Sequence, residues 1–310
     1  MNNYPLVSVI IPTYKRSDML PRAIQSVFEQ SYANMQIVVV DDNDPNTQWR
    51  KETAKIMDQF AEDKRVKYVC HEKNKNGSAA RNTGIREADG EIICFLDDDD
   101  WFLPLKTERQ VKFLMEHPEH RAVYCGWNRD DVIFNCGKEG NLSYELLSGT
   151  QLIYTNVIMM WREDALNCGG WDETFRRHQE AAFMLRYFRS GGTVGFVPEV
   201  LVEFDVSDRS NAAGNSVINE EQLNHYLSSY KDMIADCEQR NPGAAKNIYS
   251  YRYRGALLHH VKGKNWKQAW RLYIKMVKAM PLKFNADLFR YVVRRYTNER
   301  THKGKKLGQS

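Results

Sequence analysis

Glu91-Ile-Ile-Cys-Phe-Leu-Asp-Asp-Asp-Asp-Trp-Phe-Leu-Pro104 joins a short apolar run to four consecutive aspartates. The run from Glu91 to Leu96 has the length and composition of a buried strand. Like charges about 4 Å apart repel by roughly 1 kcal/mol in water and about 4 kcal/mol at a surface-like dielectric, so the crowding favours a bound cation. Carboxylate oxygens suit Mg²⁺ or Mn²⁺, which often also bind substrate phosphates. Ligands of open α/β sheets bind beyond the carboxyl ends of strands, where these aspartates lie, although a solvated acidic loop is the alternative.

The residues before this stretch alternate between strand-like and helix-like patterns. Strands rich in Val and Ile are expected at 7–12, 36–40, 66–70 and 91–96, and helices near 17–28, 47–62 and 79–88. Ser17 is the expected N-cap of the first helix, whose apolar residues follow a helical period. This order predicts an α/β fold with a doubly wound, mostly parallel sheet flanked by helices.

Beyond residue 104 the alternation becomes less regular and then turns helical. We expect a helix near 105–117, strands at 122–127 and 132–135, a helix at 180–190, a strand at 193–197 and a mobile loop at 205–215. Further helices are expected at 220–240, 244–261, 266–280 and 287–296, followed by a disordered polar tail at 301–310. The pattern predicts an α/β domain over 1–215 and a helical C-terminal extension over 216–310.

Composition and charge limit the functional classes. The chain has 310 residues and six cysteines without a CxxC pair, which makes zinc or disulfide roles unexpected. We see no apolar stretch of about 20 residues and no secretory signal, so a cytoplasmic location is expected. Residues 246–310 contain 17 Lys and Arg against 2 Asp and Glu, a net charge of +15, and because the whole chain carries +4, residues 1–245 carry −11. The basic region predicts an anionic partner, either lipid headgroups or nucleic acid.

Three further motifs lie near the predicted strand ends. Pro12-Thr-Tyr-Lys-Arg16 follows the first strand, and neither GxGxxG nor GxxxxGK[ST] occurs, which excludes the usual dinucleotide and P-loop sites. Asp41 and Asp42 end the second strand, where they could bind a nucleoside or simply cap a turn. In the stretch Asn74-Lys-Asn-Gly-Ser-Ala-Ala-Arg-Asn-Thr-Gly84, small residues allow a ligand close to the backbone, and Arg81 suits a phosphate unless it is an ordinary surface arginine.

Taken in order, these motifs resemble the family 2 glycosyltransferases with the GT-A fold. The matching stretches are Val7-Ser-Val-Ile-Ile-Pro-Thr-Tyr14, Val38-Val-Val-Asp-Asp-Asn43, Asn76-Gly-Ser-Ala-Ala-Arg-Asn82, Phe95-Leu-Asp-Asp-Asp-Asp-Trp101, Gly169-Gly-Trp-Asp-Glu-Thr-Phe175 and Arg177-His-Gln-Glu-Ala-Ala-Phe-Met-Leu-Arg186. The resemblance covers about residues 5 to 205. It implies an inverting transfer of a sugar from a nucleotide diphosphate donor, with uridine favoured as the base and Mn²⁺ or Mg²⁺ on the diphosphate.

The resemblance also implies roles for individual residues. Asp97 and Asp99 match the family's Asp-x-Asp, with Asp99 as the direct metal ligand and Asp97 as a second ligand or, like Asp98, a neighbour of the ribose. If the segment stays extended through Asp99, Asp97 and Asp99 point to one face and Asp98 to the other. The remaining residues implied around the donor nucleotide are Pro12, Thr13, Tyr14, Arg16, Asp42 and Arg81.

An inverting reaction also needs a base that takes the proton of the acceptor hydroxyl. In the family this base is usually the Asp of a Glu-Asp or Gln-Asp pair before a helix, and the matching pair here is Gln179-Glu180. We therefore expect Glu180 to be the base, with Asp172 and Glu173 as lower-ranked alternatives and a plain surface glutamate as the structural interpretation.

Two positions depart from the family pattern. Asn76 stands where a second glycine is common. The loop after Pro198 lacks the histidine that many relatives carry, so a third protein ligand for the metal stays open.

The C-terminal region lies outside the matching motifs. Aromatic and aliphatic residues such as Trp266 and Trp270 interleave with lysines there, which is typical of a helix in a membrane interface or of a basic bundle packed on the catalytic domain.

We expect a metal-dependent glycosyltransferase, cytoplasmic or peripheral at the inner face of the membrane, that extends a lipid-linked glycan during cell-surface polysaccharide synthesis. Its partners would be the nucleotide-sugar donor, the glycan acceptor and an anionic membrane surface bound by 246–310. The alternatives are a sugar-phosphate nucleotidyltransferase, which normally has a Gly-rich basic loop after the first strand, and a nucleic-acid-binding protein, for which no recognised module is present.

Overall fold

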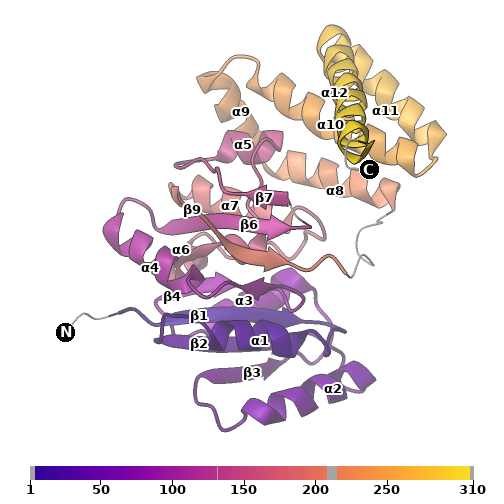
Figure 1. Cartoon of the computed structure of the whole chain (residues 1–310). Coiled ribbons are helices and arrows are strands. Elements are labelled where there is room, and N and C mark those ends of the chain that lie inside the picture. Colours follow the sequence, from indigo (N-terminus) through magenta and orange to yellow (C-terminus); the bar gives the residue numbers. More distant parts are fainter. Residues whose placement is uncertain (1–3, 131, 208–214, 308–310) are drawn as a thin grey trace. The chain divides into compact units, whose positions relative to one another are not determined.

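The computed structural model describes residues 4–130, 132–207 and 215–307, the last thirteen of these as backbone only, and divides the chain into two units (Figure 1). Unit 1 comprises Met1–Leu146 and Gln151–Ala212, and unit 2 comprises Leu147–Thr150 and Ala213–Ser310. Most of the predicted mobile loop, residues 208–214, lies outside the described residues.

Among the described residues, unit 1 is built on a nine-stranded sheet with the order β3-β2-β1-β4-β8-β6-β9-β5, and β7 pairs with β6. The strands are β1 (Val7–Thr13), β2 (Met35–Asp41), β3 (Val66–Cys70), β4 (Ile92–Phe95), β5 (Trp101–Phe102), β6 (Ala122–Arg129), β7 (Val132–Phe134), β8 (Met159–Trp161) and β9 (Val194–Phe204). The first four run parallel, as predicted. The short β8 pairs antiparallel with both β4 and β6, which makes the sheet mixed.

The helices of unit 1 cover this sheet. They are α1 (Leu20–Phe28), α2 (Gln48–Met57), α3 (Gly77–Glu87), α4 (Lys106–Glu116), α6 (Arg162–Asn167) and α7 (Gln179–Arg189), and α5 (Ser143–Ser148) begins in unit 1 and ends in unit 2. Helix α3 packs on β1 and β2, and α4 packs on β6 and β9. A Cβ on Gly84 of α3 would lie 2.2 Å from the side chain of Ile10, so glycine is needed for this close packing.

The central strands place polar residues at one edge of the sheet. All seven residues of β2 are buried, as expected for a parallel strand covered on both faces. The register pairs Thr13 with Asp41, and Ile10 with Phe95. The segments after β1, β2 and β4 therefore leave the sheet at the same edge, which positions the candidate site.

The predicted cap of α1 was wrong. Met19 occupies the N-cap position without a side-chain hydrogen bond, and the hydroxyl of Ser17 donates instead to Glu52 Oε2 at 3.1 Å. Helix α1 begins with Leu20 and Pro21, and Pro21 suits the first helical turn because its missing N–H has no intrahelical partner there.

Unit 2 is helical, as predicted, and comprises α8 (Ser216–Ser229), α9 (Lys231–Arg240), α10 (Ala244–Lys262), α11 (Trp266–Ala279) and α12 (Pro281–Leu307). The buried Glu220 of α8 joins three of these helices: His260 Nε2 of α10 lies 2.7 Å from its carboxylate, and Arg271 Nη2 of α11 donates to both oxygens at 2.7 and 2.8 Å. The single helix expected at 220–240 breaks at Tyr230.

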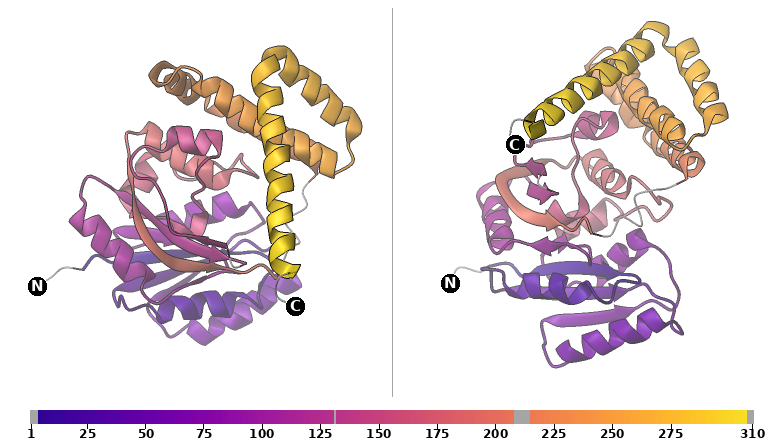
Figure 2. Two further views of the ribbon diagram at one scale, coloured as in Figure 1. Left: turned by 45° about the horizontal axis from the view of Figure 1, so that its top comes forward. Right: turned by 45° about the vertical axis from the view of Figure 1, so that its right-hand side comes forward.

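The predicted disordered tail is helical as far as Leu307, where α12 ends (Figure 2). Its last two turns are rich in lysine, which has a good helix propensity and suits the negative end of the helix dipole. No helix in the described part of the chain is both long enough and apolar enough to cross a bilayer.

Candidate active site

A pocket with a volume of about 480 Å³ lies where the chain leaves β1, β2 and β4. All eight residues implied for donor binding line it: Pro12, Thr13, Tyr14, Arg16, Asp42, Arg81, Asp97 and Asp98. Five neighbours complete the lining: Lys15, Asn74, Asn76, Gly77 and Ala80. The structure therefore brings together residues that are up to 86 positions apart, because three parallel strands end side by side.

Arg81 is held rigidly in this pocket. Its Nη2 donates to Asp97 Oδ1 at 2.5 Å and its Nη1 to Gln179 Oε1 at 3.1 Å. Its guanidinium lies 4.8 Å from the ring centroid of Trp171, which stacks on Phe183 at 4.4 Å. A guanidinium with these contacts keeps its planar donor fork in one orientation.

The Gly-Gly-Trp motif supports the same arginine. Gly169 and Gly170 have positive φ angles of 83° and 64°, a conformation that favours glycine. The turn allows the N–H of Trp171 to donate to Asn82 Oδ1, while Asn82 Nδ2 donates to the carbonyl of Trp171, both at 2.8 Å. The motif around Arg81 and the motif around Trp171 are thus joined directly in space.

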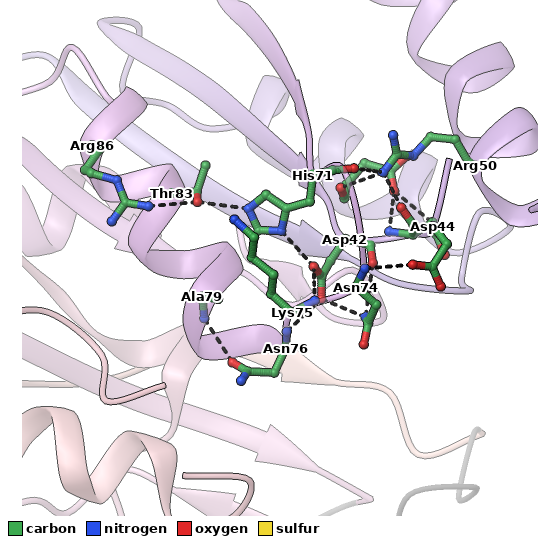
Figure 3. Close-up of polar contacts among 12 residues, drawn as sticks. Asp42, Asp44, Arg50, His71, Asn74, Lys75, Asn76, Ala79, Thr83 and Arg86 are labelled. Atoms are coloured by element: carbon green, nitrogen blue, oxygen red, sulfur yellow. Dashed lines mark hydrogen bonds and ion pairs between the residues drawn. The ribbon is translucent and has the colours of Figure 1, made fainter. Parts of the chain in front are cut away.

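Asp42 is buried, and both of its carboxylate oxygens are fully used by neighbouring groups (Figure 3). Oδ1 lies 2.7 Å from His71 Nδ1 and accepts from the N–H of Lys75 at 2.9 Å. Oδ2 accepts from Asn74 Nδ2 at 2.8 Å and from the N–H of Asn76 at 3.0 Å. Four contacts occupy the four lone-pair positions of a carboxylate. Asp42 therefore lines the pocket while it holds the loop at 74–76.

Asn76 adopts a backbone conformation that is unusual for a residue with a side chain. Its φ is 147°, and its Oδ1 accepts from the N–H of Ala79 at 3.0 Å, which caps α3. The family's common glycine would adopt this φ freely, whereas Asn76 compensates with the cap and with the hydrogen bond to Asp42.

The four aspartates form a turn, so the extended geometry assumed from the sequence was wrong. The N–H of Asp100 donates to the carbonyl of Asp97 at 3.2 Å. Asp97, Asp99 and Asp100 each offer a carboxylate oxygen, and these oxygens lie within 4.8 Å of one another. Asp98 turns toward the first strand, where the N–H of Tyr14 donates to it at 3.4 Å. The turn therefore adds Asp100 to the predicted pair of Asp97 and Asp99.

Arginines neutralise this acidic turn only in part. Besides the contact of Arg81 with Asp97, Arg16 Nη1 lies 2.6 Å from Asp99 and 3.4 Å from Asp98. Burial raises the pKa of Asp98 to about 7. Burial, followed by the charges of Asp97 and Asp99, raises the pKa of Asp100 to about 8. Burial, followed by the charge of Asp97, also raises the pKa of Asp99.

The donor set of this turn fits a hard divalent ion. It consists of carboxylate oxygens without a sulfur or imidazole ligand, as Mn²⁺ and Mg²⁺ prefer. Burial raises the pKa values of Asp98, Asp99 and Asp100, and neighbouring aspartate charges add to this effect, so a cation beside the turn would be favourable. Asp97, Asp99 and Asp100 are the residues that could hold the ion.

Three supporting residues were missed by the sequence interpretation. Asn156 Oδ1 accepts from the N–H of Asp97 at 2.8 Å, and its Nδ2 donates to Asp100. The N–H of Asp205 donates to Asp100 Oδ1 at 2.8 Å, and His71 supports Asp42 as described. These contacts join distant parts of the chain, so no local motif signalled them.

Glu180 lies in the first turn of α7, next to the residue that binds Arg81. Its side chain is half-buried, and burial raises the pKa of its carboxyl, against lowering contributions from a backbone hydrogen bond and from Arg81. The two alternative acids have structural partners: Glu173 Oε1 accepts from Asn82 at 2.9 Å, and Asp172 Oδ1 accepts from the N–H of Thr174 at 2.9 Å.

Comparison with known proteins now identifies the family. The model of "Glycosyl transferase family 2" matches residues 8–192, more than half of the chain. This chain belongs to glycosyltransferase family 2. Its unit 1 has the GT-A fold, as the motifs predicted, and family membership replaces the nucleotidyltransferase alternative.

Three of the most similar proteins illustrate the relationship. The amylovoran biosynthesis glycosyltransferase AmsB of Erwinia amylovora is 28% identical over 225 residues, which cover 68% of this chain and 73% of AmsB. The UDP-Glc:alpha-D-GlcNAc-diphosphoundecaprenol beta-1,3-glucosyltransferase WfgD of Escherichia coli is 36% identical over 118 residues, 38% of this chain and 44% of WfgD. The structure of the mannosyltransferase PcManGT from Pyrobaculum calidifontis in complex with GDP-Man and Mn²⁺ superposes with a TM-score of 0.58 at 17% identity, over 94% of this chain and 86% of that one. For several other curated relatives, the aligned part spans only 15% to 45% of their length.

Proposed function

We propose that this glycosyltransferase moves a sugar from a UDP-sugar to a hydroxyl group of a lipid-linked glycan, with inversion at the anomeric carbon, during synthesis of a cell-surface polysaccharide. The observation that carries the proposal is the pocket in which the residues after β1, β2 and β4 meet beside the acidic turn. The names of AmsB and WfgD support a polysaccharide product, a UDP-sugar donor and an acceptor linked to a lipid diphosphate.

Tyr14 and Lys15 form the part of the proposed donor site that would contact the nucleobase. The ring of Tyr14 is 41% exposed and can stack on a nucleobase. Lys15 has a left-handed backbone with φ of 60°, and its N–H donates to Asn43 Oδ1 at 3.0 Å. Its Nζ lies 4.8 Å from the ring centroid of Tyr14 and 4.4 Å from that of Trp49, which limits the movement of Tyr14. The hydrogen bonds of Asp42 support this side by holding the loop at 74–76.

The diphosphate side is formed by Arg81, Arg16 and the acidic turn. A Mn²⁺ or Mg²⁺ ion held by Asp97, Asp99 and Asp100 would stabilise the charge that develops on the leaving diphosphate. Arg81 is fixed by Asp97, Gln179 and Trp171, so its fork needs little reorganisation to bind a phosphate oxygen. Arg16 bridges Asp98 and Asp99 and thereby orients two aspartates at once.

Glu180 is the proposed general base on the acceptor side. A raised pKa makes a carboxylate a stronger base near neutral pH, provided that it is ionised. Arg81 lowers the pKa of Glu180 and so favours the ionised form, which is the form that accepts the hydroxyl proton.

Replacement of Glu180 by Gln tests this assignment. We expect Glu180→Gln to bind the UDP-sugar with unchanged Kd in the presence of Mn²⁺, measured by calorimetry, and to lose at least about 10³-fold in transfer rate. Glu173→Gln is the matched control, because the amide oxygen of its new side chain can still accept from Asn82, and this variant should retain transfer. If Glu180→Gln retains turnover, the general base must be another residue.

A thermal-shift panel of nucleotide sugars identifies the donor. A ligand that binds only the folded state raises the melting temperature by mass action. We expect UDP-sugars with Mn²⁺ to give the largest shift and EDTA to abolish it. A larger shift with a sugar linked to another nucleotide would overturn uridine as the nucleoside of the donor.

A further inference from the structure

Helices α11 and α12 of unit 2 expose several large apolar side chains. The exposed fractions are 64% for Trp266, 66% for Trp270, 86% for Leu282 and 70% for Phe289. Side chains of this size normally pack in a core or an interface, so a group of four exposed on two consecutive helices indicates a binding surface.

These residues form two stripes that meet. On α11, Trp266, Trp270, Tyr273 and Val277 are spaced by 4, 3 and 4 residues and share one face of the helix. On α12, Leu282, Phe289 and Val293 are spaced by 7 and 4 residues and also share a face.

Tyr273 joins the two stripes. Its ring centroid lies 5.7 Å from that of Trp270, and its hydroxyl donates to Asn285 Oδ1 on α12 at 2.9 Å. Asn285 lies between the buried Phe284 and the exposed stripe of α12 around the helix. The two stripes therefore lie on the side of α11 and α12 where Tyr273 meets Asn285. We call the residues of both stripes together the apolar seam.

The charges around the apolar seam are almost all positive. Residues 262–294 contain nine Lys and Arg and a single acidic residue, Asp287. Asp287 is already engaged, since Lys283 Nζ lies 3.0 Å and Arg290 Nη1 3.6 Å from its carboxylate. Lys267 and Lys278 on α11 are exposed and leave a positive flank beside the seam.

We propose that the apolar seam and its basic flank dock on an anionic lipid membrane surface. Exposed tryptophans beside lysines are typical of helices that lie in the headgroup region, where the rings enter the acyl boundary and the ammonium groups stay with lipid phosphates. A second copy of the chain is a poorer partner, because a two-fold contact would bring two strongly basic surfaces together. The proposal goes beyond the transfer reaction and needs neither donor nor acceptor.

Sedimentation of the full chain with vesicles tests the docking. We expect binding to vesicles of phosphatidylcholine with about 30% phosphatidylglycerol, weakening with salt, and at least about tenfold weaker binding to phosphatidylcholine alone. Trp266→Ser with Trp270→Ser should weaken binding about tenfold or more, through loss of the inserted rings. Lys267→Glu with Lys278→Glu should weaken it by roughly 25-fold or more, because each basic residue near an anionic surface changes affinity about fivefold.

Matched controls come from unit 1. Val132 and Ile133 are 59% and 62% exposed on β7, and the double Ser variant should bind vesicles normally. Lys51 and Lys55 are exposed on α2. Their double Glu variant tests whether the loss of any two positive charges is enough to weaken vesicle binding. Circular dichroism should show that all variants are folded.

Four results would overturn the proposal. One is the absence of binding to anionic vesicles. Another is unchanged binding of the folded Trp266→Ser/Trp270→Ser variant. The third is a concentration-dependent increase in mass, lost in that variant and seen without vesicle binding, which would assign the seam to self-association. Salt-sensitive binding of oligonucleotides without vesicle binding would likewise assign the basic flank to nucleic acid.

Discussion

Two groups of aspartates lie at the ends of β2 and β4, the strands on either side of β1, and they differ in how their charges are balanced. Asp41 is the last residue of β2, and Asp42 follows it. Asp41 accepts from Tyr68 Oη at 2.6 Å and pairs with Arg50 Nε at 3.0 Å. The four contacts of Asp42 leave its carboxylate without a free lone pair. This pair behaves as a structural support of the pocket wall.

The aspartates after β4 are different. Four carboxylates share two arginines, and the pKa values of Asp98 and Asp100 rise to about 7 and 8. Buried carboxylates with strongly raised pKa values are candidates for a functional site, and we propose that this turn binds a cation. The contrast teaches that the same residue type at the same sheet edge differs in role according to whether hydrogen bonds and ion pairs balance its charge.

The largest expected effect comes from removing a charge of the acidic turn. Asp99→Asn should lower the transfer rate by about 10³-fold, or about 4 kcal/mol, because one ligand of the proposed ion is lost. It should also abolish the Mn²⁺-dependent rise in melting temperature, while the metal-free protein changes little in stability. A Mn²⁺-dependent rise equal to that of the wild type would contradict the distinction between the two groups.

The supporting group should respond in the opposite way. Asp42→Ala leaves a histidine, an amide side chain and two backbone N–H groups without their acceptor, and should lower the free energy of unfolding by about 3 kcal/mol, measured by urea denaturation. Asp44→Ala is the control, because this exposed carboxylate accepts from the N–H of Asn74 and should cost less than about 1 kcal/mol. Equal losses in the two variants would show that Asp42 has no special role.

The pH dependence of stability gives a smaller effect with a defined sign. The pKa values of Asp98 and Asp100 are raised from 3.8 to about 7 and about 8, so the folded state binds more protons than the unfolded state between these values. Their stabilising contribution is therefore complete below about pH 4 and is lost as the pH rises through about 7 to 8. The metal-free protein should melt at a higher temperature at about pH 5 than at about pH 8. Each kcal/mol of lost stability should lower the melting temperature by roughly 2–4 °C.

Calorimetry with two variants checks the origin of this slope. Asp98→Asn should flatten it, because one of the titrating groups is removed. Asp63→Asn should leave it unchanged, since hydrogen bonds from Arg65 lower the pKa of this half-buried carboxyl. A higher melting temperature at the more alkaline pH would contradict the assignment.

The smallest expected effect concerns the second contact behind Asp42. His71 Nε2 lies 2.9 Å from Thr83 Oγ1, so Thr83→Val should reduce the free energy of unfolding by about 1 kcal/mol. Thr83→Ser keeps the hydroxyl and should recover most of that loss. If the Val and Ser variants behave alike in denaturation, the contact of His71 with Thr83 contributes nothing measurable.

Much of unit 1 could be predicted because its signals are local. The apolar runs that form β1 to β4 and the helices between them repeat with the periods of their own secondary structure. The parallel arrangement follows from the alternation of strands and helices, and it brings the motif residues to one edge. The roles of the proposed binding residues came from the resemblance of these motifs to family 2 glycosyltransferases.

The insertion of β8 between β4 and β6 had no local signal. A three-residue strand has little pattern, and its position depends on pairing with segments far away in the chain. The same holds for the break at Tyr230 in unit 2, where helix propensity alone predicted one continuous helix. Asp100 was missed because the run was assumed to stay extended.

The sequence by itself determined which carboxylates lie at the carboxyl ends of the strands, because strand boundaries follow from nearby residues. Only the tertiary structure decided which of them are balanced, since their partners come from distant segments: His71 for Asp42, and the N–H of Asp205, 105 residues away, for Asp100. Hydrogen bonding and burial set the charge state of a carboxylate, and both depend on what the folded chain brings beside it.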